Sequence, residues 1–333
     1  MDWLGNNNGP DPDRQALLSS VSTLQCPILS YLYPQIFQSG TANSPMDELH
    51  KSNQLTSGAA LDAASSVRDA YLDLMKKCLT FSLWEAKDGS IEFAGENMAK
   101  RAVKALLGRH TQQDNSPSAL QARRHEGRDW PVLAHTMIGM KRLDNLQFCV
   151  EDVLRKGVPG DLIESGVWRG GATIFMRAIL KAYGIVDRRV WVADSFAGLP
   201  LPDPAKYPAD NNDKHHTKVP LAVSLDEVKE NFRKYSLLDD KVCFLKGWFK
   251  DTLPNAPFQK LAIVRMDGDM YESTMDGLTN LYPKLSQGGY LIVDDFGAVP
   301  ACREAVEDFR RENGISEAIK QIDWGGVFWR REK

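Results

Sequence analysis

The sequence predicts an α/β fold built on a mostly parallel sheet with helices on both faces. Past residue 160, short apolar runs such as DLIESG, VWVADS, LAIVRMDGD and GYLIVDD alternate with amphipathic segments, in a chain of 333 residues. One amphipathic segment begins at Ser224, and Glu227 three residues on completes a capping box. This alternation is typical of parallel strands joined by helices. Because such sheets bind ligands beyond the carboxyl ends of their strands, the residues that end each apolar run form the candidate site.

The composition limits the class of partner. Lys and Arg total 41 against 44 for Asp and Glu, so the chain has no positive excess that would attract nucleic acid or an anionic membrane. The N-terminus has no signal-peptide pattern, and no stretch reaches the roughly 20 apolar residues of a membrane span. We therefore expect a soluble cytoplasmic protein with a small-molecule partner. Without any CxxC spacing, its cysteines are predicted to be buried free thiols: Cys26, Cys78, Cys149, Cys243 and Cys302.

Three parts of the chain differ in composition. Residues 1–65 are rich in Asn, Ser, Gly and Pro around one apolar patch, which predicts a partly flexible N-terminal extension with short helices. Residues 66–150 are predicted to be a helical cap or lid region. Residues 151–333 carry the strand and helix alternation and are predicted to be the ligand-binding domain.

Four local predictions accompany this division. Apolar residues at helical spacing predict a helix over residues 66–86. The polar segment 109–130 is predicted to be a mobile loop or lid. Residues 207–220, long for a strand-to-helix connection, either close over the site or form a solvated loop. Two apolar segments around Gly325 and Gly326 predict a hairpin at the sheet edge.

The first two apolar runs end in groups suited to a nucleoside. Glu164 precedes a glycine-containing turn into a helix, where an acidic side chain can accept hydrogen bonds from an ammonium or hydroxyls. The spacing ExGxxxG differs from the GxGxxG dinucleotide fingerprint and resembles the S-adenosylmethionine loop of class I methyltransferases. Asp194 ends the second run, where an acidic residue would hold a ribose diol, unless it merely caps a helix. After the third run, Trp248 or Phe249 covers an adenine ring or belongs to the core.

Four aspartates follow the fourth and fifth runs, and they carry the strongest signal. Asp267 and Asp269 leave one strand, and Asp294 and Asp295 leave the next. Carboxylates at neighbouring strand ends repel one another in a desolvated cleft unless a cation or protons intervene. Oxygen ligands of this kind suit Mg²⁺, Mn²⁺ or Ca²⁺ better than zinc. The alternative is that two of the four cap helices.

Several motifs in order resemble the macrocin O-methyltransferase family over roughly residues 66–333. They include HTMIGMKRLDNLQ, IESGVWRGGA, VADSFAGLP, VKENFRKYSLLDDKVCFLKGWFKDTLP and RMDGDMYESTMDG, followed by GGYLIVDDFG. The resemblance implies a class I, Rossmann-like methyltransferase with a seven-stranded sheet. It also implies S-adenosylmethionine as methyl donor, Mg²⁺, and a deoxysugar hydroxyl of a glycosylated natural product as acceptor. The residues before 66 do not resemble the usual N-terminus of the family.

The resemblance also implies roles for individual residues. Asp267, Asp294 and Asp295 look like the metal ligands. The predicted contacts of the methyl donor are Thr136, Met137, Glu164, Ser165, Gly166, Trp168, Gly170, Asp194, Ser195, Gly247, Trp248 and Asp267.

Methyl transfer to a hydroxyl needs a base, for which we favour Asp267, as a metal ligand that doubles as base, with Asp269 as the alternative. A metal that binds the hydroxyl would lower its pKa and orient it. His125, His135, His215 and His216 are rival bases, although none of them ends a strand. Three other functions stay open: methylation of a phenolic hydroxyl, an NAD-dependent oxidoreductase, and a non-catalytic nucleoside-binding relative. A homo-oligomer is also left open.

Overall fold

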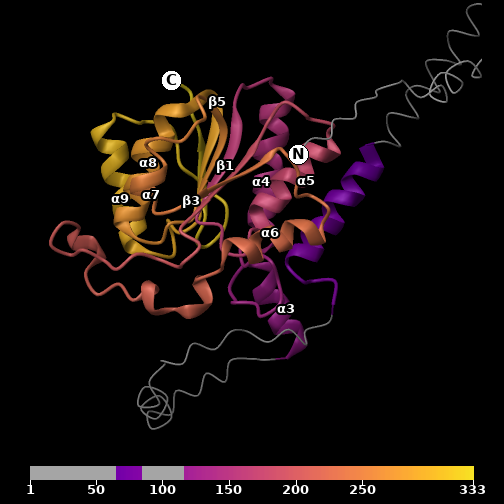
Figure 1. Cartoon of the computed structure of the whole chain (residues 1–333), viewed down its shortest axis with the longest axis horizontal. Coiled ribbons are helices and arrows are strands. Elements are labelled where there is room, and N and C mark those ends of the chain that lie inside the picture. The colour runs from indigo at the N-terminus through magenta and orange to yellow at the C-terminus, as the bar shows by residue number, and fades with distance from the viewer. Residues whose placement is uncertain (1–64, 85–115) are drawn as a thin grey trace, which may run out of the picture. The chain divides into compact units, whose positions relative to one another are not determined.

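The computed structural model describes residues 65–84 and 116–333 (Figure 1). The predicted N-terminal extension, Cys26 and the first part of the polar segment 109–130 therefore lie outside the described residues. Within the described ranges, no helix is long and apolar enough to cross a membrane.

The described residues form a seven-stranded sheet in the order β3-β2-β1-β4-β5-β7-β6. The five strands β1 to β5 are parallel, and β7 pairs antiparallel with both β5 and β6. This confirms the predicted mostly parallel sheet and its edge hairpin. The strands are β1 (Asp161–Ser165), β2 (Val190–Asp194), β3 (Val242–Lys246), β4 (Leu261–Met266), β5 (Leu285–Val293), β6 (Lys320–Gln321) and β7 (Val327–Arg330).

Helices cover both faces of the sheet (Figure 1). The helices α4 (Gly139–Arg155), α5 (Gly171–Ala182) and α6 (Leu225–Lys234) pack on one face. The opposite face is covered by α7 (Phe249–Thr252), α8 (Tyr271–Leu281) and α9 (Pro300–Glu312). The remaining described helices are the one over residues 65–79, α3 (Pro117–His125) and the short 3-10 turns η2 (Pro208–Asp210), η3 (His215–Thr217), η4 (Val219–Leu221) and η5 (Tyr282–Lys284).

The central strands bury both of their faces, as parallel strands between two helical layers must. In β1, Leu162 belongs to the core under α4 and α5, whereas its neighbour Ile163 belongs to the core under α8 and α9. In β2, Val192 and Trp191 divide between the two cores in the same way. Full burial of such a side chain stabilises the fold by about 1.5–3 kcal/mol. The apolar runs that predicted the strands therefore supply both cores.

Two local predictions are wrong in extent. The predicted helix over 66–86 ends at residue 79, where the Thr80 hydroxyl donates to the carbonyl of Lys76 at 2.9 Å and Phe81 adopts a φ of 58°. Both features compete with continuation of the helix. The predicted loop 109–130 contains α3, whose N-cap residue is Ser116; the Ser116 hydroxyl accepts a hydrogen bond from the Ala119 amide at 3.3 Å. A capping side chain thus starts a helix in a segment that is polar overall.

Other local predictions are confirmed. Ser224 caps α6, because its hydroxyl accepts a hydrogen bond from the Glu227 amide at 3.2 Å. The described cysteines are free: Cys149 and Cys302 are buried, as expected, while Cys78 and Cys243 are only half-buried. The helix α4 crosses the predicted boundary between residues 150 and 151 and packs with α5 in one core. The division of the chain into domains stays a prediction.

Gly166 makes room for the close approach of two strand ends. Its φ is 85°, and a Cβ atom there would lie 1.8 Å from the backbone oxygen of Asp267. Because only glycine leaves this space empty, the end of β1 and the end of β4 lie in direct contact. This contact brings the candidate residues of the two strands together.

Replacement of Gly166 by alanine should therefore destabilise the fold. A left-handed conformation alone costs a side chain about 1–2 kcal/mol, and overpacking adds about 1–3 kcal/mol. We expect Gly166→Ala to lower the free energy of unfolding, measured by chemical denaturation, by more than about 2 kcal/mol. Gly184→Ala is the matched control, since Gly184 has a φ of 66° and no heavy atom within 4 Å of its Cβ position. Equal losses in the two variants would contradict the steric argument.

Candidate active site

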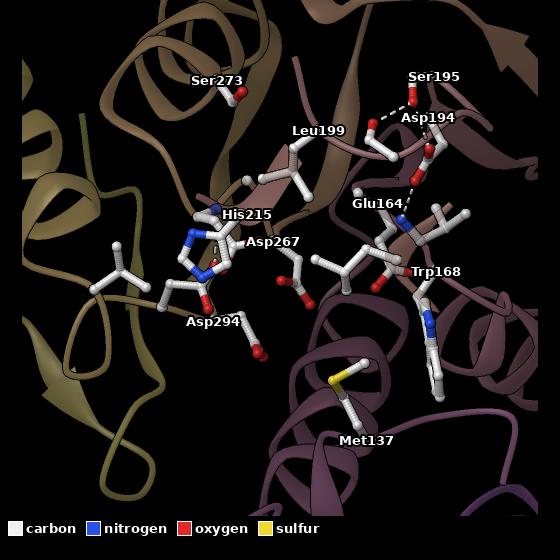
Figure 2. A pocket seen from close by; sticks show the side chains of 18 of the residues that line it. Met137, Glu164, Trp168, Asp194, Ser195, Leu199, His215, Asp267, Ser273 and Asp294 are labelled. Carbon is white, nitrogen blue, oxygen red and sulfur yellow. Dashed lines mark hydrogen bonds and ion pairs between the residues drawn. The ribbon is translucent and has the colours of Figure 1, made fainter. Parts of the chain in front are cut away.

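A cavity of about 360 Å³ lies at the carboxyl edge of the parallel strands (Figure 2). This volume is within the usual range for a small-molecule site. It collects the ends of all five parallel strands, as the fold prediction required. The predicted site residues that line it are Thr136, Met137, Glu164, Gly166, Trp168, Asp194, Ser195, Gly247, Trp248, Asp267, Asp269, Asp294 and Asp295.

Two residues predicted to contact the methyl donor do not line this cavity. Ser165 is buried, and its hydroxyl lies on the α8 side of the sheet, 3.8 Å from the position of a Cβ on Gly277. Gly170 begins α5 with a φ of 86° and faces Val228 and Phe232 of α6. The geometry gives both a packing role. Both residues are adjacent in sequence to residues that line the cavity, but adjacency alone does not determine the direction of a side chain.

Glu164 presents an unsatisfied acceptor to the cavity. Its side chain is buried, Oε1 accepts a hydrogen bond from Arg265 Nη1, and Oε2 has no hydrogen-bond partner among the described residues. Burial raises the pKa of this carboxyl from 4.5 to about 7. Since buried polar atoms are almost always paired, Oε2 marks the place where a ligand donor fits. The ammonium group of an amino-acid ligand has the charge and the protons that this oxygen lacks.

Asp194 organises the neighbouring turn. One carboxylate oxygen accepts from the Val167 amide at 2.8 Å and the other from the Phe196 amide at 2.7 Å. Burial nevertheless raises the pKa of Asp194. The turn places Trp168 at a φ of 48°, and the indole Nε1–H donates to the carbonyl of Pro220 at 2.8 Å. Asp194 therefore shapes the cavity wall as well as lining it (Figure 2).

Asp267, Asp294 and Asp295 form a compact group of carboxylates. Each offers one oxygen, and these oxygens lie within 4.8 Å of one another. Burial and the neighbouring carboxylates raise the pKa values of Asp267 and Asp295 well above their usual range. A divalent cation would relieve the same repulsion, and an all-oxygen set of this kind fits Mg²⁺ or a similar hard cation.

Two buried arginines offset part of this repulsion, and the sequence analysis missed both roles. One oxygen of Asp294 accepts from Arg142 Nη1, and the other accepts from Arg265 Nη2. Arg142 of α4 also donates to Asp323 at 2.8 Å. These guanidiniums reduce the repulsion between the carboxylates, so the clustering of aspartates at strand ends is weaker evidence for a bound cation than the sequence alone suggested. A signal was present for Arg265, because a charged residue within a buried apolar strand must be paired.

Asp269 occupies a separate position beside the group. Its backbone amide donates to Asp295 Oδ2 at 3.1 Å, and its own carboxylate lies 3.9 Å from His215 Nε2. The other ring nitrogen of His215 is 2.6 Å from Asp213, and this hydrogen bond raises the pKa of the histidine. Burial raises the pKa of Asp269. Among the four histidines considered, His215 is thus the one that lines the cavity.

The segment that carries His215 is tied to the start of α8. Asp210, which is buried, accepts from the backbone amides of Tyr271 and Glu272 at 2.6 and 3.0 Å. His215 does not end a strand, so its place in the cavity could not be predicted from the strand ends. The connection that carries it, which contains η2, η3 and η4, reaches the cavity through tertiary contacts. Further lining residues that we did not predict include Trp130, Leu199, Pro200, Leu221, Val299 and Trp324.

The other histidines lie elsewhere. His125 and His216 are exposed, and neither lines the cavity. His135 Nδ1 is 2.7 Å from the Tyr235 hydroxyl, and burial lowers the pKa of this histidine from 6.5 to about 4. It is therefore neutral and away from the cavity at physiological pH.

The sheet order and the strand-end cavity define a class I methyltransferase, an enzyme that takes its methyl group from S-adenosylmethionine. Residues 68–331 match the family model "Macrocin-O-methyltransferase (TylF)". The chain belongs to this family and is an S-adenosylmethionine-dependent O-methyltransferase. This confirms the resemblance and removes the oxidoreductase and non-catalytic alternatives.

Three relatives are similar over most of their length. The chain is 52% identical to 8-demethyl-8-(2,3-dimethoxy-alpha-L-rhamnosyl)-tetracenomycin-C 4'-O-methyltransferase of Streptomyces olivaceus, over 79% of this chain and 93% of that protein. It is 58% identical to mycinamicin III 3''-O-methyltransferase of Micromonospora griseorubida, over 62% of this chain and 83% of that protein. It is 49% identical in sequence to the O-methyltransferase NovP, whose structure is solved. The structural alignment covers 80% of this chain and 100% of the NovP chain, with a TM-score of 0.69.

The lowered pKa of His135 predicts an acid-sensitive contribution to stability. The unfolded chain takes up this proton near pH 6.5, but the folded protein does so only near pH 4. Unfolding therefore binds the proton between these values, so the contribution is fully present above pH 6.5 and is lost as the pH falls toward 4. We expect His135→Gln to lose less stability than the wild type across this window in denaturation series. His216→Gln, at an exposed position, should follow the wild type, and parallel curves for all three proteins would contradict the assignment.

Proposed function

We propose that this enzyme methylates a sugar hydroxyl of a glycosylated natural product with the help of Mg²⁺. The observation that carries the proposal is one cavity that contains both the unpaired Glu164 oxygen and the carboxylate group of Asp267, Asp294 and Asp295. The first fits an amino-acid end of the methyl donor, and the second fits a hard divalent cation. Support for the acceptor comes from the relatives, one of which is named for a rhamnosyl tetracenomycin.

The chain's own residues divide the binding of the donor. Glu164 Oε2 accepts from the donor ammonium, which supplies the missing hydrogen bond of this buried oxygen. Asp194 keeps the turn at the end of β1 in place through its two backbone hydrogen bonds and offers its remaining lone pairs to the ribose hydroxyls. Thr136, Met137 and Trp248 lie on the cavity wall and enclose the rest of the nucleoside.

Asp267, Asp294 and Asp295 would hold the cation. When bound there, a divalent cation lowers the pKa of an acceptor hydroxyl and fixes its orientation. The two guanidiniums that contact Asp294 hold that carboxylate in place from both of its oxygens, which prepares it as a ligand. Both base candidates line the cavity, and we favour Asp269 over Asp267 because Asp269 does not belong to the compact group of three.

Removal of one carboxylate of the group should slow the methyl transfer step. We expect Asp295→Asn to lower kcat by on the order of 100-fold or more, while the affinity for S-adenosylhomocysteine, measured by calorimetry, changes little. Treatment of the wild type with EDTA should have the same effect. Asp276→Asn is the matched control, because Asp276 lines the cavity outside the group of three. Wild-type rates after both Asp295→Asn and EDTA would remove the cation from the reaction.

The base assignment makes a separate prediction. A positioned base contributes typically ~10²–10⁴-fold, so Asp269→Asn should reduce kcat by about that factor. His215→Gln should reduce it less, by under about tenfold, because His215 reaches the acceptor side only through Asp269 in this assignment. Steady-state rates and donor affinities of the two variants decide between them. A larger loss in His215→Gln than in Asp269→Asn would make the histidine the base.

A further inference from the structure

Arg265 is a buried guanidinium shared by three carboxylates. Its side chain is 1% exposed. Nη1 donates to Glu164 Oε1 and to Asp267 Oδ2, the second at 3.2 Å, and Nη2 donates to Asp294 Oδ1. The neighbouring strands β1 and β4 place Arg265 beside Glu164 in the parallel register. A single rigid group therefore links carboxylates from the ends of three strands.

These three carboxylates belong to different halves of the cavity. Glu164 carries the unpaired oxygen assigned to the methyl donor, while Asp267 and Asp294 belong to the cation group. Figure 2 shows Glu164 between Asp194 on one side and Asp267 and Asp294 on the other. Arg265 is thus the connection between the two halves.

We propose that Arg265 couples the binding of the cation to the binding of the methyl donor. The inference rests on the proposed function, since it assigns the two ligands to these two halves. A cation held by Asp267 and Asp294 would draw on carboxylates that Arg265 also contacts. The hydrogen bond of Nη1, now divided between Glu164 and Asp267, would then pass to Glu164. Glu164 is then held more firmly with Oε2 free for the donor, so the cation strengthens donor binding.

The geometry of a guanidinium is essential to this coupling. Arg presents several N–H groups in a fixed plane, so a change of hydrogen-bond partner at one nitrogen alters the hydrogen bonds that the other nitrogen makes. Lys keeps the positive charge but offers one nitrogen on a flexible stem. Direct repulsion between the cation and the ammonium group of the ligand acts in the opposite sense in every variant. Comparison of Arg265→Lys with the wild type therefore isolates the contribution of the guanidinium.

Arg142 supplies a contrast within the same cavity. It donates hydrogen bonds to Asp294 and Asp323 but, within the part of the chain that the structure describes, none to Glu164. It therefore lies on the cation side alone. Arg177 is a second contrast, because it is equally buried but pairs with Asp239, outside the lining of the cavity.

The test is a linkage measurement on the full chain by calorimetry. S-adenosylhomocysteine, which lacks the reactive methyl group, is titrated with and without saturating Mg²⁺, and Mg²⁺ is titrated with and without saturating S-adenosylhomocysteine. By reciprocity the two experiments must give the same factor. We expect Mg²⁺ to tighten S-adenosylhomocysteine binding about fivefold or more in the wild type. In Arg265→Lys the factor should fall to about one or below.

The controls separate this inference from the proposed function. Arg142→Lys should change the Mg²⁺ affinity but keep the factor, and Arg177→Lys should keep both. If Arg265→Lys does not fold, Glu164→Gln tests the same link from the donor side and should also lose the factor. A factor of one in the wild type, or an equal factor in wild type and variants, overturns the coupling. Failure of the wild type to bind Mg²⁺ at all would instead contradict the proposed function.

Discussion

The balance of buried charge at the carboxyl edge of the sheet is the constraint on which this structure depends. Parallel strands bring Glu164, Asp267 and Asp294 to one place, where their mutual repulsion opposes folding. Arg142 and Arg265 offset part of this repulsion, but burial first and the neighbouring carboxylates second still raise the pKa values of Asp267 and Asp295. The remaining negative potential is what a cation and a positively charged methyl donor can use.

The backbone around this edge is shaped to keep those charges close. Gly166 lets the ends of β1 and β4 touch, and Asp194 fixes the following turn through two amide hydrogen bonds. Both features cost the protein conformational freedom at the place where precision of the site matters most. Packing on the two faces of the sheet supplies the stability that sustains this arrangement.

Much of this architecture could be predicted from the sequence, because its signals are local. Apolar runs gave the parallel strands, and the topology of such sheets then placed Asp194, Asp267 and Asp294 at one edge without knowledge of any contact. The direction of individual side chains, and the pairing of residues far apart in the sequence, could not be predicted from such local signals. Ser165 faces away from the cavity, and Arg142 reaches Asp294 across 152 positions of the chain. Such pairings depend on how helices pack against the sheet, which no local pattern reports.

The tether at Asp210 has a consequence for redesign of acceptor choice. The connection that carries His215 is held at Asp210 to the first turn of α8 and at Pro220 to the indole of Trp168. Both anchors are made by backbone groups or buried side chains, whereas the residues between them face the cavity or the solvent. The residues between Asp210 and Pro220 can therefore be exchanged as one loop. A grafted loop that keeps these two attachment points changes the wall of the cavity and leaves the residues assigned to the methyl donor in place.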